Sequence, residues 1–158
     1  MVVGVGQPLR GDDGVGPLVA GLVRQARLAG VEVRETRGDL LSLASVWRDY
    51  ALVIIVDAAD TGGPPGTLTR LEAHAGVLPA QVRPSCSSHG VGLAEAVELA
   101  RTLGTLPPRL IIFAVAGQDF SLGAPVSPEV AAGAQRAVAA VLEELAAAGW
   151  EEQSPPID

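Results

Sequence analysis

The sequence contains no lysine: all 11 basic side chains among its 158 residues are arginines. This absence excludes a lysine Schiff base and the P-loop lysine that binds nucleotide phosphates. The single cysteine, Cys86, excludes an internal disulfide framework, a multi-cysteine zinc site and a cysteine-ligated iron–sulfur cluster. Any chemistry must therefore come from Asp, Glu, His, Ser, Arg and the backbone.

The sequence also lacks clusters of basic residues and apolar runs of membrane-spanning length, and its first residues lead us to expect no signal peptide. The formal net charge is −7, and duplex nucleic acid binds proteins that neutralise its phosphates. We therefore expect a cytoplasmic protein with no nucleic-acid partner and no membrane contact. We also expect a monomer.

Short apolar segments alternate with amphipathic segments along the chain, which predicts an α/β fold in which helices cover both faces of a sheet. The length is that of one domain, assigned here to residues 1–150, with a frayed tail over 151–158. Strands are expected at 2–5, 31–35, 51–56, 67–72 and 110–115. Helices are expected at 15–30, where Gly30 ends the first one, and at 40–46, 93–104 and 128–148. Ser127 is expected to cap the last helix, with Pro128 at its first position.

Two acidic segments and one histidine follow predicted strands or precede a predicted helix. Asp12 and Asp13 lie in the loop after the first strand, Asp57 is expected to end the central strand, and His89 precedes a helix. Ligands of α/β folds bind beyond the carboxyl ends of the strands, so these side chains are expected at one edge of the sheet. Two carboxylates and an imidazole suit a divalent metal such as zinc or nickel, with coordination positions left open.

Each of these residues also has a structural interpretation. Asp12 or Asp13 can cap the first helix, and Asp57 can cap a turn. Cys86 is close enough in sequence to His89 to be a fourth ligand, although a small buried cysteine is the commoner state. The other histidine, His74, has no polar neighbours of this kind and is expected to be exposed.

Two rival sites are weaker. The segment Gly4-Val5-Gly6 begins like a dinucleotide fingerprint, but Leu9 stands where the third glycine belongs. A serine hydrolase would have a G-x-S-x-G motif at a strand-to-helix turn, and the sequence has none. Nucleotide binding and serine hydrolysis are therefore both disfavoured.

Four motifs in order resemble those of the nickel–iron hydrogenase maturation proteases. They are Gly4-Val5-Gly6-Gln7-Pro8-Leu9-Arg10-Gly11-Asp12-Asp13-Gly14-Val15-Gly16; Val56-Asp57-Ala58 with Pro65-Gly66-Thr67; Ser87-Ser88-His89-Gly90 with Gly92-Leu93-Ala94-Glu95; and Gly117 to Phe120 with Gly123 and Ser127-Pro128-Glu129-Val130. The resemblance extends to about Leu145. Gln7 departs from the pattern, because the family usually has Asn there.

This resemblance implies an endopeptidase that removes a C-terminal extension from the hydrogenase large-subunit precursor after nickel insertion. It also implies a twisted, mostly parallel five-stranded sheet between helix layers. The metal ligands of the family correspond to Asp13, Asp57 and His89, and the nickel is supplied by the substrate, although other divalent metals can substitute.

Two mechanisms are compatible with these residues. The metal can activate water or polarise the scissile carbonyl. Alternatively, it can only position the substrate while Asp12 or Asp57 assists the attacking water. A non-catalytic nickel-sensing or chaperone module on the same scaffold is the alternative function.

Overall fold

The computed structural model describes residues 1–79 and 92–150. His89, Cys86 and the expected tail at 151–158 lie outside the described residues. Within them, five strands form one sheet in the order β2-β1-β3-β5-β4. The strands are β1 (Val2–Val5), β2 (Val33–Thr36), β3 (Leu52–Ala59), β4 (Leu68–Glu72) and β5 (Arg109–Ala116). The predicted α/β fold with a mostly parallel five-stranded sheet is confirmed, since only β4 runs antiparallel to its neighbour.

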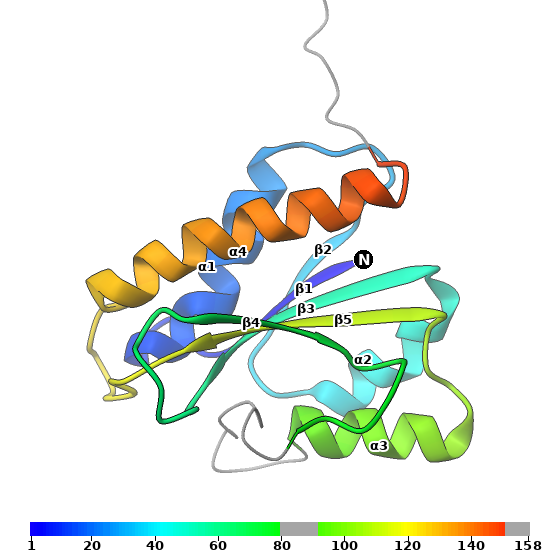
Figure 1. Cartoon of the computed structure of the whole chain (residues 1–158), viewed down its shortest axis with the longest axis horizontal. Helices are drawn as coiled ribbons and strands as arrows, with labels where there is room; N and C mark the ends of the chain where they lie inside the picture. Colours follow the sequence, from blue (N-terminus) through cyan, green and yellow to red (C-terminus); the bar gives the residue numbers. More distant parts are fainter. Residues whose placement is uncertain (80–91, 151–158) are drawn as a thin grey trace, which may run out of the picture.

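Helices cover both faces of the sheet. Helices α1 (Val15–Gln25) and α4 (Pro128–Ala147) lie on one face, and α2 (Leu40–Val46) and α3 (Leu93–Leu103) lie on the other (Figure 1). None of the helices formed by residues 1–79 and 92–150 is long and apolar enough to cross a membrane.

Strand β3 is the centre of the core, because all eight of its residues are buried. Its side chains alternate between the two faces of the sheet, as the pleat of a strand requires. Val53 and Ile55 join the apolar cluster under α2 and α3, whereas Ile54 and Val56 join the cluster under α1 and α4. A continuous apolar run is thus explained by burial on both faces.

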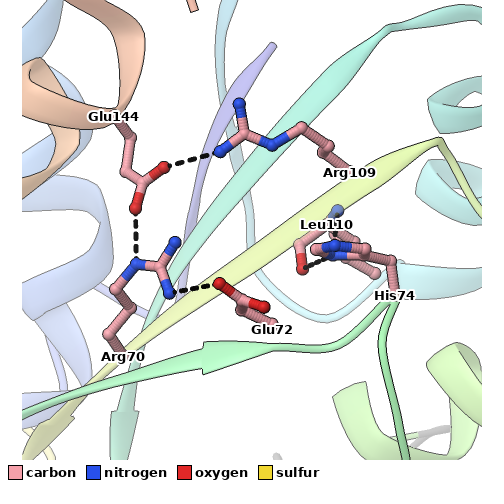
Figure 2. Close-up of polar contacts among 6 residues, drawn as sticks. All are labelled: Arg70, Glu72, His74, Arg109, Leu110 and Glu144. Atoms are coloured by element: carbon pink, nitrogen blue, oxygen red, sulfur yellow. Dashed lines mark hydrogen bonds and ion pairs between the residues drawn. The ribbon is translucent and has the colours of Figure 1, made fainter. Parts of the chain in front are cut away.

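A network of ion pairs fastens the edge of the sheet to α4. Figure 2 shows the carboxylate of Glu144 between two guanidinium groups, those of Arg70 on β4 and Arg109 on β5. Arg70 also pairs with Glu72 at 2.8 Å. The Glu144 side chain is only 12% exposed, so this network lies partly out of solvent.

The expectation that His74 is exposed was wrong. The side chain is half-buried, and its Nδ1 accepts a hydrogen bond from the backbone N–H of Leu110 at 3.1 Å (Figure 2). The backbone N–H of Ala73 donates to the carbonyl of Leu110 at 2.9 Å, so the imidazole continues the pairing of β4 with β5 past the last strand residue.

Two element ends differ from expectation by more than two residues. The first helix ends at Gln25, not at Gly30, because Arg27 adopts a left-handed conformation with φ of 49°. The central strand continues through Asp57 to Ala59, because its backbone stays paired with β5 over all eight residues.

Candidate functional site

The site lies where the chain reverses its direction across the sheet. From β1 the chain passes to β2 on one side, and β3 then pairs with β1 on the other side. Such a switch point creates a crevice at the carboxyl ends of the two central strands. The loop after β1 carries Asp12 and Asp13, and β3 carries Asp57.

Asp57 lies inside β3, yet it reaches this edge of the sheet. Gly4 of β1 is level with Val56, so the last residue of β1 is level with Asp57. The loop that follows β1 therefore begins beside Asp57, although β3 itself runs two residues further. The predicted placement of Asp57 at the carboxyl edge thus agrees with the register, even though the predicted strand end was wrong.

Asp57 is buried, with 3% of its surface exposed. Burial raises its pKa well above the usual range, and the nearby negative charge of Asp13 raises it further. The backbone N–H of Ala58 opposes this shift but does not cancel it. Asp57 is therefore a buried acid that holds its proton more tightly than an ordinary carboxyl group.

Asp13 is half-buried, and its negative charge is near enough to raise the pKa of Asp57. Burial raises the pKa of Asp13, against the opposing effects of the backbone N–H of Gln7 and the positive charge of Arg10. The N–H of Gln7 donates to Asp13 Oδ2 at 2.8 Å. Gly6 permits this turn, because its φ is +136° and a Cβ there would lie 1.9 Å from the carbonyl oxygen of Asp13.

Asp12 has a different environment from its neighbour. It has no exposed surface, and its Oδ2 accepts hydrogen bonds from the N–H groups of Gln118 (2.9 Å) and Asp119 (3.0 Å). Its Oδ1 accepts from the N–H of Ser127 at 2.7 Å. Burial alone would raise the pKa of Asp12, but the backbone donors outweigh it and the pKa lies below its usual value.

The helix-capping interpretation of Asp12 and Asp13 was wrong. They form a 3₁₀ turn, Gly11–Gly14, ahead of α1, and neither side chain caps the turn or the helix. Ser127 occupies the N-cap position of α4 with Pro128 next to it, as predicted, but its side chain makes no capping bond. Sequence reasoning missed that Asp12 binds the loop between β5 and α4, since no local pattern signals a contact across more than 100 residues.

A metal ion would find two carboxylates here. Among residues 1–79 and 92–150, no three His, Cys, Asp or Glu side chains are grouped to hold a metal. Asp13 and Asp57 are near enough for the negative charge of Asp13 to raise the pKa of Asp57, and a cation beside such a pair would relieve this repulsion. The predicted third ligand, His89, falls outside the described residues.

The profile of the hydrogenase maturation protease family matches residues 31–144, about 70% of the chain. The chain belongs to this family. The relatives of this family member include the hydrogenase expression/formation protein HupD of Thiocapsa roseopersicina, 27% identical over 153 residues that cover 94% of this chain and 68% of HupD. A Methanocaldococcus jannaschii protein named as a hydrogenase maturation protease is 28% identical over 151 residues. The matched region covers 92% of this chain and 95% of that protein.

Solved structures agree with the assignment to the hydrogenase maturation proteases. The hydrogenase-maturating endopeptidase HybD of E. coli superposes with a TM-score of 0.76 at 27% identity, covering 95% of this chain and 93% of HybD. A hydrogenase 2 maturation peptidase from a Thaumarchaeota archaeon superposes with a TM-score of 0.63 at 30% identity, covering 91% and 95% of the two chains.

Proposed function

We propose that this family member is an endopeptidase that removes the C-terminal extension of a nickel–iron hydrogenase large-subunit precursor after nickel insertion. The observation that carries the proposal is the pair of acidic side chains at the switch point: Asp57, buried in β3, and Asp13, held by the loop after β1. Membership of a protease family supplies the reaction class. We further propose that the protein acts as a monomer in the cytoplasm.

The nickel belongs to the substrate in this proposal. Asp13, Asp57 and His89 supply two carboxylates and one imidazole, which leave coordination positions for ligands from the precursor. Binding the nickel of the precursor orients the polypeptide that follows it, so the bond to be cleaved is held at the switch point. A precursor without nickel lacks this anchor and is not cleaved.

Of the two acids proposed to assist the attacking water, Asp57 has the better-suited environment. Without nickel, the raised pKa of Asp57 favours its protonated form; with one carboxylate oxygen on the nickel, the other oxygen is the one that accepts the proton of the attacking water. Both oxygens of Asp12 already accept backbone hydrogen bonds, and its pKa is lowered. We therefore assign the proton-accepting role to Asp57.

The test uses the purified chain with purified large-subunit precursor, with and without nickel. We expect mass spectrometry to show a C-terminally shortened product only for the nickel-loaded precursor. Asp13→Asn, Asp57→Asn and His89→Ala should each lower the rate by a factor of about 100 or more, as loss of a binding or acid–base group does.

Asp60→Asn is the matched control, because Asp60 is an exposed carboxylate directly after β3. It should cleave at the rate of the unsubstituted protein. Full activity in all three site variants would contradict the site. Tight binding of the nickel-loaded precursor without any cleavage would instead favour the non-catalytic nickel-sensing or chaperone function.

A further inference from the structure

The loop after β1 and the loop between β5 and α4 form one unit, here called the double loop (residues 6–14 and 117–127). Besides the three bonds to the Asp12 carboxylate, six backbone hydrogen bonds join its halves or close its turns. Three of these cross between the halves: Gly11 N–H to Ala124 at 3.0 Å, Asp12 N–H to Asp119 at 2.8 Å, and Gly123 N–H to Leu9 at 2.8 Å. The other three close turns within one half: Arg10 N–H to Gln7 at 3.1 Å, Asp13 N–H to Arg10 at 3.2 Å, and Ala124 N–H to Ser121 at 3.2 Å.

The two halves are in direct backbone contact. Gly11 has a φ of +56°, and a Cβ at this position would lie 2.1 Å from the carbonyl oxygen of Asp119. A contact of this kind leaves no space for the halves to shift independently. Any group carried by one half is therefore held in a fixed position relative to groups carried by the other.

The double loop exposes two large apolar side chains. Leu9 is 75% exposed and Leu122 is 83% exposed, on opposite halves of the unit. Their backbones are neighbours, because the residue after Leu122 donates its N–H to the carbonyl of Leu9. Two leucines exposed to this extent on one rigid support do not contribute to the core and are available to a partner.

The same unit carries Asp13 of the site. The N–H of Gln7 binds the Asp13 carboxylate, and Leu9 lies two residues further along the same turn. A polypeptide that brings its cleaved bond to Asp13 and Asp57 must continue past the edge of the sheet, where the double loop lies. The occupant that this position favours is therefore the substrate chain and not a second copy of the protein.

We propose that Leu9 and Leu122 are the apolar contact for the precursor segment next to the cleaved bond. This inference rests on the proposed function and adds to it a requirement on the substrate: that segment carries apolar side chains. Leucine has no hydrogen-bonding group, so the contact selects by burial of apolar surface and contributes to binding, not to the chemical step.

The test compares the double variant Leu9→Ser/Leu122→Ser with the unsubstituted protein on nickel-loaded precursor. We expect KM to rise about tenfold and kcat to stay within about a factor of two, since the lost contacts act on binding of substrate and transition state alike. Asp57→Asn blocks cleavage and also removes one nickel ligand, so the Kd for the same precursor is compared by sedimentation with and without the two leucine changes in that background. It should rise by the same factor, because the lost ligand is common to both proteins. The melting temperature should not change, because both side chains are exposed.

Leu103→Ser is the control, because Leu103 is 65% exposed at the far end of α3, on the opposite face of the sheet. It should leave KM and kcat unchanged. An unchanged KM and Kd in the double variant would overturn the inference while leaving the protease proposal intact.

Two other results are informative. A double variant that loses self-association but keeps its KM would show that the leucines contact a second copy, and would overturn the inference. If the unsubstituted protein binds precursor without cleaving it, the protease proposal fails, and the tenfold rise in Kd still decides the role of the leucines.

Discussion

Asp12 and Asp57 are both aspartates buried near the same edge of the sheet, and their environments shift their pKa values in opposite directions. Asp12 has three backbone N–H donors, from Gln118, Asp119 and Ser127, whereas within residues 1–79 and 92–150 the backbone N–H that lowers the pKa of Asp57 is that of Ala58. Burial disfavours the charge at both positions. The donors reverse this effect at Asp12, and they do not at Asp57.

The difference separates a structural carboxylate from a reactive one. A buried charge with its lone pairs occupied holds the surrounding backbone in place and has little capacity for new partners. A buried charge with few donors is costly to the fold and gains from a proton or a metal ion. The same substitution at the two positions should therefore have opposite effects on stability.

Asp12→Asn tests the structural half of this comparison and should have the largest effect. An amide presents one oxygen and an NH₂ group to three N–H donors, so at least one donor loses its acceptor. We expect the free energy of unfolding at pH 7 to fall by about 3 kcal/mol, as measured by urea denaturation.

Asp49→Asn is the control for that experiment, because Asp49 is an exposed carboxylate, 74% accessible, beside Arg48. Its effect should stay below about 0.5 kcal/mol. An Asp12→Asn protein as stable as the unsubstituted one would show that the three donors do not depend on the negative charge.

Asp57→Asn tests the reactive half and should stabilise the protein by about 1 kcal/mol at pH 7. Because the folded-state pKa of Asp57 is raised above its unfolded value, its contribution to stability is complete below the unfolded pKa and is lost as the pH rises through the folded pKa. The advantage of Asp57→Asn should thus grow from pH 4 to pH 8.

Thermal unfolding of both proteins across this pH range measures the effect. Asp12 has the opposite sign, because its lowered pKa gives stability above the unfolded pKa that is lost as the pH falls through the folded pKa. A gap between the unsubstituted protein and Asp57→Asn that narrows with rising pH would contradict the assignment of a raised pKa to Asp57.

Glu144→Gln should have the smallest effect. Its carboxylate is paired with the guanidinium groups of Arg70 and Arg109 at a partly open edge, where charges are screened. We expect a loss of about 0.5 kcal/mol that shrinks in 1 M salt. Glu143→Gln, one residue earlier and exposed, should be neutral; equal effects at both positions would mean that the network does not fasten α4.

The sequence predicts most of the fold because local patterns dominate it. The continuous apolar run around Ile54 requires burial on both faces, and the helix from Leu40 to Val46 was predicted with its observed bounds. The end of β3 was missed because Asp57 is polar, whereas its backbone pairing with β5 is decided by a strand distant in sequence. Helix α1 ends before Gly30 because Arg27 has a positive φ, and arginine is not a residue type that indicates a left-handed conformation.

The candidate site was predicted in part for the same reason. Because ligands of α/β folds bind beyond the carboxyl ends of the strands, the sequence predicts Asp13 and Asp57 at one edge of the sheet. The negative charge of Asp13 raises the pKa of Asp57 there. Local sequence patterns do not distinguish Asp12 from Asp13, since both are aspartates in the same turn, and only the family resemblance assigned the ligand role to Asp13. Their separation depends on the backbone N–H groups of residues 118, 119 and 127, which only the folded chain brings to Asp12.

The double loop has a consequence for protein engineering. A designer who wishes to retarget this protein would transplant recognition segments from a relative, and residues 117–127 are an obvious choice. If residues 117–127 alone were exchanged, the backbone N–H groups of the new segment would not match the position of the Asp12 carboxylate. The mismatch would displace the neighbouring Asp13. Successful chimeras should therefore exchange residues 6–14 together with 117–127, as one cassette.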